Sequence, residues 1–220
     1  MKKRFTALAA VICAAATSFT GCKKDDASSG GSAAKEKSSV MTSEDRVAEK
    51  YKDVEDVRSG PQLSISRTTA PAGGRAEVTI SVENADNTWN ICGLHFIYPE
   101  ELDCLNLGSE DSDMVKYSLG GACDNFSLAS SMEWFGDTPE DLIGKGRKMV
   151  FFTAGDSTDS GLSGDIATFF FDIPADAESG TEYPFDFYFY STDQFTNVSG
   201  DKTMEKYAFT HWQGGSVTVE

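Results

Sequence analysis

The residues that could carry chemistry are few, and their spacing does not assemble a known catalytic site. The chain has two histidines, His95 and His211, which leaves little for metal binding or acid–base catalysis by imidazole. Its 35 acidic residues offer so many carboxylate pairs that none stands out as the pair a glycosidase needs. The signatures of zinc proteases, serine hydrolases and phosphate- or dinucleotide-binding loops are missing. The sequence therefore predicts a protein that is not an enzyme.

One acidic segment superficially resembles a calcium-binding loop. Asp156-Ser-Thr-Asp-Ser-Gly161 has a carboxylate at the first position and glycine at the sixth. Thr158 and Ser160 occupy the third and fifth positions, and Ala167 occupies the twelfth, where a bidentate glutamate is required. We therefore expect no metal site and no cofactor on this chain.

Composition and charge narrow the classes of partner. The 220 residues include 19 Lys and Arg against 35 Asp and Glu, which gives a formal net charge of −16. Binding to nucleic acid or to an anionic membrane surface needs a basic footprint, so both are disfavoured. The chain is 40% hydrophobic and contains 15 Phe and 7 Tyr, which indicates a folded domain rather than a disordered chain.

The N-terminus has the pattern of an export signal. A basic start, Met1-Lys-Lys-Arg4, precedes an apolar run over Phe5–Ala16 that is too short to span a bilayer but suits a secretory signal. Phe19-Thr-Gly-Cys22 resembles a bacterial lipobox, whose cysteine receives a diacylglycerol. We expect residues 1–21 to be removed, Cys22 to be lipidated, and the protein to sit at the extracellular face of the cell membrane through this anchor alone. Cleavage after a small-residue site at Ala14–Ala16 is the alternative.

Residues 22–60 are expected to form a flexible tether with a short charged helical segment. Lys23–Ser39 is rich in Ser, Gly, Ala and charge, which is typical of a flexible coil. Thr42–Asp45 could cap a helix in which Val47, Tyr51 and Val54 share one side. This segment either packs on the domain or a partner, or is a solvated spacer. Ser59-Gly-Pro61 marks the expected start of the folded domain, residues 61–220.

From Gln62 onward the hydrophobic pattern has a period of two, which is typical of strands. Leu63 and Ile65 alternate with serines, and Val78, Ile80 and Val82 repeat the pattern. With turns rich in Gly and Pro between them, these short strands predict an all-β, antiparallel nine-stranded β-sandwich. The other strands are expected at Ile91–Tyr98, Leu102–Leu107, Phe126–Trp134, Lys148–Thr153, Ile166–Ile173, Tyr183–Tyr190 and Gly215–Val219.

Three cysteines lie in the predicted domain, so they cannot all pair within one chain. Cys92 and Cys104, on apolar strand faces, are expected to be small core residues. A disulfide between Cys104 and Cys123 remains open, because exported proteins commonly oxidise their cysteines.

The order of these segments over Gln62–Glu220 resembles a cohesin domain. No single segment is specific, but together they follow the order and spacing of that family. A departure is the absence of an Asp that the family carries after the tyrosine of its third strand. The matching segments are Pro71–Val82, Gly93–Leu102, Asn125–Ala129, Lys148–Ser157, Gly164–Phe171, Gln194-Phe195 and Gly214–Val219.

The resemblance implies a jelly-roll sandwich without catalytic activity that binds dockerins. Dockerins are small calcium-loaded helical pairs on polysaccharide-degrading enzymes or scaffold proteins, so the calcium would belong to the partner and contact with polysaccharide would be indirect. The expected function is that of a lipid-anchored receptor with a single cohesin. The alternative is a carbohydrate-binding sandwich, because Tyr183–Tyr190 is rich in aromatic residues.

The resemblance places the dockerin on the face of the third, fifth, sixth and eighth strands, with the tip after the eighth strand contributing. Strand alternation then selects the side chains that point outward. Phe152 is expected to be the central anchor, with Phe152→Ala costing more than about 2 kcal/mol of binding free energy. The expected partner-binding residues are Ile91, Gly93, His95, Ser127, Ala129, Ser131, Val150, Phe152, Thr196 and Asn197.

Overall fold

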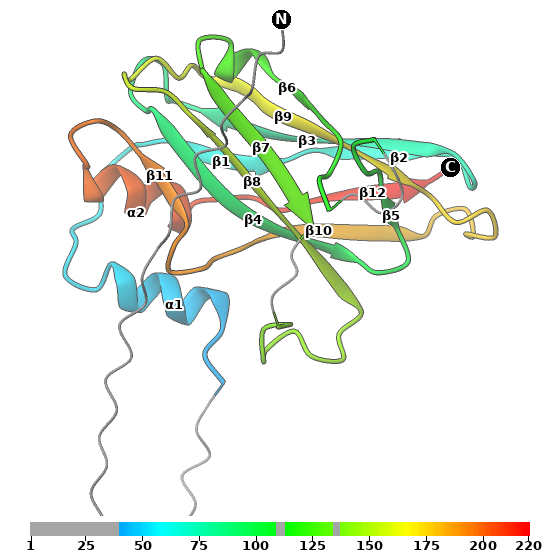
Figure 1. Ribbon diagram of the computed structural model, residues 1–220. Coiled ribbons are helices and arrows are strands. Elements are labelled where there is room, and N and C mark those ends of the chain that lie inside the picture. The colour runs from blue at the N-terminus through cyan, green and yellow to red at the C-terminus, as the bar shows by residue number, and fades with distance from the viewer. Residues whose placement is uncertain (1–39, 109–112, 134–136) are drawn as a thin grey trace, which may run out of the picture. The chain divides into compact units, whose positions relative to one another are not determined.

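Two β-sheets packed face to face form the framework of the computed structural model, which describes residues 40–108, 113–133 and 137–220 (Figure 1). The smaller sheet has the strand order β1-β3-β9-β5, with β6 also paired to β9. The larger sheet has the order β2-β12-β10-β4-β8-β7, with β11 also paired to β4. The predicted all-β sandwich is therefore confirmed.

The described residues contain twelve strands and three short helices, so the sequence pattern missed some elements. Each of the nine predicted segments contains a strand, and β2, β6 and β11 are additional. Helix α2, which follows β11, is a further element that the strand pattern does not include. The strands are β1 (Gln62–Ile65), β2 (Arg67–Ala70), β3 (Arg75–Glu83), β4 (Ile91–Pro99), β5 (Asp103–Cys104), β6 (Tyr117–Leu119), β7 (Leu128–Glu133), β8 (Arg147–Gly155), β9 (Gly164–Asp172), β10 (Glu182–Tyr188), β11 (Gln194–Thr196) and β12 (Gly215–Val219); the helices are α1 (Ser43–Lys50), the 3₁₀ helix η1 (Gly121–Cys123) and α2 (Lys202–Thr210).

Most neighbouring strands are antiparallel, but the edge strand β2 is not. It pairs parallel with β12, with Thr68 opposite Val217, while β12 is antiparallel to β10 on its other side. Parallel neighbours need a long connection. Here nearly the whole sandwich lies between β2 and β12, so the first and last parts of the domain meet at one edge.

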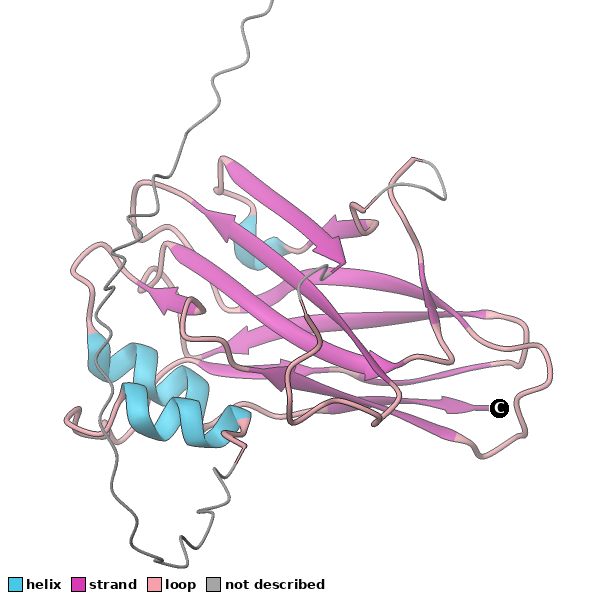
Figure 2. Cartoon of the chain, turned by 60° about the horizontal axis from the view of Figure 1, so that its bottom comes forward, coloured by secondary structure: helices cyan, strands magenta, loops and turns pink. Residues whose placement is uncertain are grey.

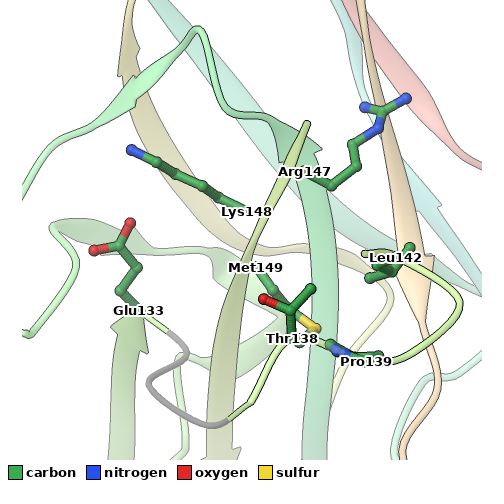
Figure 3. A pocket seen from close by; sticks show the side chains of 7 residues that line it. All are labelled: Glu133, Thr138, Pro139, Leu142, Arg147, Lys148 and Met149. Atoms are coloured by element: carbon green, nitrogen blue, oxygen red, sulfur yellow. The ribbon is translucent and has the colours of Figure 1, made fainter. Parts of the chain in front are cut away.

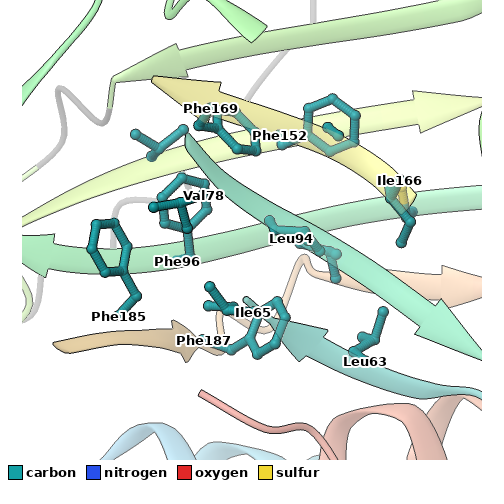
Figure 4. Packing of buried hydrophobic residues seen from close by; sticks show 14 of the residues in the cluster. Leu63, Ile65, Val78, Leu94, Phe96, Phe152, Ile166, Phe169, Phe185 and Phe187 are labelled. Carbon is teal, nitrogen blue, oxygen red and sulfur yellow. The ribbon is translucent and has the colours of Figure 1, made fainter. Parts of the chain in front are cut away.

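Aromatic side chains fill the space between the sheets. The Phe169 ring lies 4.9 Å from the Phe96 ring and 5.8 Å from the Phe152 ring, measured between centroids. Figure 4 shows these residues with their aliphatic neighbours from both sheets. All three phenylalanines are at most 1% exposed. Such tilted contacts between large apolar rings are the packing on which a sandwich of this size depends.

A β-bulge in the smaller sheet explains one departure from strict alternation. Ile80 of β3 pairs with Ala167 and the next residue, Ser81, pairs with Asp165, so Ile166 of β9 has no opposite residue. Ile166 and Ala167 are consecutive, yet both are buried. The bulge turns both side chains toward the core.

The segment before the sandwich, from Val40 onward, is part of the same compact unit as the sandwich. Thr42 caps α1 through a capping box with Asp45, as its sequence suggested. Val47 and Tyr51 are buried, and the Tyr51 ring lies 6.3 Å from that of Phe209 on α2. The predicted boundary at residue 61 is therefore corrected: the segment from residue 40 packs on the sandwich. Figure 2 shows the two α-helices side by side.

Several predictions about the N-terminus fall on residues that the structure does not describe. The signal segment 1–21, lipidation of Cys22 and the tether up to Ser39 lie outside the described residues. Within the described ranges, no helix has the length and apolar character needed to cross a membrane.

Candidate functional site

Strand β4 presents the side chains that the sequence predicted on each of its faces. Cys92, Leu94, Phe96 and Tyr98 are buried in the core between the sheets. Ile91 and Ile97 are half-buried on the other face. Residues alternate between the two faces of a strand, so Gly93 and His95 lie on this outer face as well.

The predicted orientation of β8 is wrong. Phe152 pairs with Leu94 and Val150 pairs with Phe96, so both share the core face of their partners. Both side chains are fully buried. Val150 and Phe152 therefore cannot contact a partner in the folded protein. Met149, Phe151 and Thr153 point outward instead.

The predicted orientation of β7 is also wrong. Ala129 pairs with Ala154 and Ser131 pairs with Phe152, which places Ala129 and Ser131 on the core side, and Ser131 is fully buried. Ser127 precedes the strand and is exposed, and its hydroxyl donates a hydrogen bond to Asp156 Oδ1 at 3.1 Å. The outward residues of β7 are Leu128, Ser130 and Met132.

These registers create an exposed apolar surface on the outer side of the larger sheet, which we call the β4–β8–β7 face. Leu128 is 73% exposed and Met132 is 41% exposed, both high for large apolar side chains. Contiguous apolar surface of this kind marks interaction sites. The β4–β8–β7 face is defined by Ile91, Gly93, Leu128, Ser130, Met132, Phe151 and Thr153.

A shallow groove of about 410 Å³ runs along one end of this face. Beside it, the half-buried Phe151 ring lies over Gly93: a Cβ atom added to Gly93 would be 3.7 Å from that ring. This distance is an ordinary van der Waals contact, so the Phe151 ring packs directly over β4 at Gly93. The groove is lined by Ile91, Leu128, Ala129, Ser130, Thr153, Ala154 and Gly155.

His95 lies on the outer side of β4 but is covered, which corrects its predicted role as a contact residue. It is 2% exposed, and its ring lies 4.7 Å from the Phe151 ring and 4.6 Å from the Tyr190 ring, measured between centroids. Its Nδ1 is 2.7 Å from Asp193 Oδ1. Burial raises the pKa of Asp193, and the hydrogen bond from His95 partly opposes that rise.

The predicted tip after β11 lies beside the face. Thr196 pairs with Ile91, so the strand end adjoins the groove. Asn197 Oδ1 accepts hydrogen bonds from Ser199 Oγ at 2.8 Å and from the Asp201 amide at 3.0 Å, which fixes the turn that follows. Val198, at 62% exposure, is the most exposed apolar side chain of this tip.

The loop over residues 137–146 closes the other end of the face. Leu142 is buried against Met149 and Tyr188 in a small apolar cluster outside the main core. Asp141 accepts a hydrogen bond from the Tyr188 hydroxyl at 2.6 Å, and its Oδ2 lies 3.7 Å from Arg46 of α1. Figure 3 shows the small pocket of about 160 Å³ between this loop and the start of β8, where Glu133 and Lys148 lie at its rim.

The aromatic segment that suggested a sugar platform is largely covered. Phe185, Phe187, Tyr188 and Phe189 are at most 3% exposed. The Arg46 guanidinium lies 4.6 Å from the centre of the Tyr188 ring and covers it. A sugar-binding platform needs exposed, coplanar rings, and these residues do not supply them.

Neither metal-ligand clusters nor disulfides occur among the residues described. No group of three or more His, Cys, Asp or Glu residues in residues 40–108, 113–133 and 137–220 could hold a metal ion. Cys92, Cys104 and Cys123 are free thiols, so the Cys104–Cys123 disulfide is not formed.

Comparison with known proteins places this geometry in a recognised fold. No family model matches the sequence, and no curated protein matches it either. Among solved structures, the chain is similar to a type III cohesin module from the cellulosomal ScaE cell-surface anchoring scaffoldin of Ruminococcus flavefaciens. That match has a TM-score of 0.60 and 26% identity, over 74% of this chain and 89% of that one.

Two more distant structures have the same fold. One is a type I cohesin–dockerin complex from Clostridium thermocellum (TM-score 0.52, 14% identity, 74% of this chain and 100% of that one). The other is a non-cellulosomal cohesin from the archaeon Archaeoglobus fulgidus (TM-score 0.51, 13% identity, 74% and 92%). The domain therefore has the cohesin fold.

Proposed function

We propose that the domain is a dockerin receptor that binds its partner on the β4–β8–β7 face. The observation that carries this proposal is the exposed apolar groove on the larger sheet of a chain with the cohesin fold. The solved structures with this fold include complexes between a cohesin and a dockerin. The similar Ruminococcus module belongs to a cell-surface anchoring scaffoldin, which agrees with a role in attachment.

The chemistry of the face suits a helical partner with an apolar side. Leu128, Met132 and Phe151 offer apolar surface, and Ser130, Thr153 and Gly155 keep it flat between them. Burial of such side chains supplies most of the affinity of a protein interface, while polar groups at the rim set register. Asn197 and Ser127 are the rim groups at the end nearest the tip.

The proposal extends to the location of the protein. With Cys22 lipidated and residues 1–21 removed, the receptor would be held at the extracellular face of the membrane, where it would tether dockerin-bearing enzymes or scaffold proteins. No catalysis and no cofactor are expected on this chain, and the calcium would be carried by the dockerin. These statements stay predictions.

Calorimetric titration of the full chain against a panel of dockerins, with calcium and then with EDTA, tests the proposal. We expect tight binding to at least one dockerin that is lost on chelation. Retention in polysaccharide gels without any dockerin binding would overturn the proposal in favour of a sugar-binding module.

A matched pair of variants tests the assigned face. Leu128→Asp should weaken dockerin binding by roughly tenfold or more, because it places an unpaired charge in a desolvated interface. Leu119→Asp changes a side chain of 41% exposure on β6, in the other sheet, and should bind like the wild type. Equal binding by both variants would refute the face assignment.

A further inference from the structure

A chain of contacts runs from α1 to the centre of the β4–β8–β7 face. Lys50, the last residue of α1, donates a hydrogen bond from Nζ to the Asp193 carbonyl oxygen at 2.8 Å. The Asp193 carboxylate meets His95 Nδ1 at 2.7 Å. The His95 ring in turn packs on Phe151, with 4.7 Å between ring centroids. Each of these contacts joins residues that are far apart in the sequence.

The middle of this chain of contacts is removed from water. His95 is 2% exposed and Asp193 is 1% exposed. The second carboxylate oxygen of Asp193 accepts a hydrogen bond from the Tyr190 amide at 3.1 Å. Hydrogen bonds in a low-dielectric surrounding are strong and costly to break, so this pair holds the His95 ring in one position. Phe151 packs against that ring and over Gly93, so it has little freedom to move toward the sheet.

Helix α1 is itself tied to the segment that carries Asp193. Ser43 Oγ accepts a hydrogen bond from the Phe189 amide at 2.7 Å, and Arg46 Nε donates one to the Phe189 carbonyl at 2.9 Å. Phe189 follows the last residue of β10, so α1 satisfies buried backbone groups that the sheet leaves without a strand partner. Removing α1 would release the 189–193 segment that covers His95.

We propose that α1 is a positioning element of the partner-binding face, acting through Lys50, Asp193 and His95 to hold Phe151 in place. This inference rests on the proposed function for its binding consequence. It makes the residues before the sandwich part of the receptor rather than part of a linker. A receptor cut at residue 61 would keep its sheets but lose the support under the centre of its face.

Two substitutions in the full chain interrupt the contacts at different links. Lys50→Met removes the hydrogen bond to Asp193. It also removes an ion pair, because Lys50 Nζ lies 3.5 Å from Glu205 Oε1, but the buried Glu205 carboxylate keeps its pairing with Lys202. Asp193→Asn keeps the size of the side chain but removes the charge that faces His95. The matched control is Lys52→Met, since Lys52 is 58% exposed and its partner is Glu49 on the surface of the same segment. Urea unfolding would verify that all three variants are folded at the temperature of the assay.

The first readout needs no partner. The chain has two histidines, so the imidazole NMR signals of His95 can be assigned against those of His211. We expect both interrupting variants to shift the His95 signals and the ring signals of Phe151, and the control to leave them unchanged. Unchanged signals in both interrupting variants would overturn the proposed positioning, whether or not any dockerin binds.

The second readout is calorimetric titration with a dockerin that binds the wild type. Coupling through packed networks supports a loss of roughly twofold to thirtyfold in affinity for Lys50→Met and Asp193→Asn, and none for Lys52→Met. Shifted NMR signals with wild-type affinity would overturn the inference, because α1 would then serve stability alone. If no dockerin binds the wild type, the proposed function fails, while the NMR readout still decides whether α1 positions Phe151.

Discussion

Phe151 and Phe152 are adjacent in the sequence, but their side chains lie on opposite faces of β8. Phe152 is fully buried against Phe169 and Tyr117, at 5.8 and 5.5 Å between ring centroids. Phe151 is half-buried on the outer face, where it packs on His95. One side chain therefore belongs to the core and the other to the candidate binding face, and a single substitution at each position separates stability from binding.

Phe152→Ala is expected to lower the free energy of unfolding by about 3–5 kcal/mol, because it leaves a cavity between the sheets. Phe151→Ala should cost about 1 kcal/mol, as a change at a half-buried site, while weakening dockerin binding. Urea denaturation monitored by tryptophan fluorescence measures the first effect and titration of the folded protein measures the second. A Phe152→Ala protein as stable as the wild type would contradict the assigned register of β8.

At the scale of the element, both α-helices depend on side-chain caps at their N-termini. In α2 the cap is Asp201, whose Oδ1 accepts hydrogen bonds from the Thr203 amide at 2.9 Å and the Thr203 hydroxyl at 2.7 Å. The Thr203 hydroxyl and then the amides of Thr203 and Met204 lower the pKa of Asp201 below its ordinary value of 3.8. The charged carboxylate also interacts favourably with the helix N-terminus.

Asp201→Ala should therefore destabilise the protein by about 1 kcal/mol at neutral pH. Because the folded protein lowers the pKa of this carboxyl, its contribution is full above the unfolded pKa near 3.8 and is lost as the pH falls through the lower folded pKa. The stability difference between wild type and Asp201→Ala should thus shrink in acid. Asp201→Asn, which keeps an acceptor oxygen, is the control and should lie closer to the wild type at neutral pH. A difference between wild type and Asp201→Ala that does not change with pH would contradict the capping role.

At the scale of the whole molecule, burial controls the reactivity of the cysteines. Cys92 and Cys123 are fully buried. Desolvation raises the pKa of the Cys92 thiol well above its ordinary value and that of Cys123 to about 12, so neither forms the reactive thiolate at neutral pH. The thiols are protected by the fold and not by pairing with one another.

We expect Cys92 and Cys123 to resist alkylation by iodoacetamide in the native protein and to react fully in denaturant. Peptide mapping by mass spectrometry separates them from Cys13 and Cys22, which lie outside the described residues. The rate of native-state labelling should follow global unfolding, since both thiols belong to the main core. A Cys104–Cys123 disulfide in a non-reducing peptide map would contradict the free-thiol state.

Local patterns in the sequence were enough to predict the class of fold and the approximate position of each major strand. Alternation with a period of two and the glycine- and proline-rich turns are local signals, and they remain readable without knowledge of the partner strands. The same alternation predicted the orientation of β4 correctly, because its large apolar residues Leu94, Phe96 and Tyr98 occupy every second position and so lie on one face.

Which side chains of β7 and β8 belong to the candidate site depends on how these strands pair with their neighbours, and local patterns do not reveal this. Every residue of Met149-Val-Phe-Phe152 is apolar, so alternation cannot tell which face of the strand is buried. The orientation is set by pairing with β4, where Phe152 lies opposite Leu94. On β7, the large apolar Leu128 points outward and the small Ser131 inward, against the usual preference for burial. The helical pattern of residues 43–51 likewise could not predict which residues α1 packs against. The contacts of α1 with Phe189, Asp193 and Phe209 join residues more than 130 positions apart, and long-range packing of this kind leaves no trace in local periodicity.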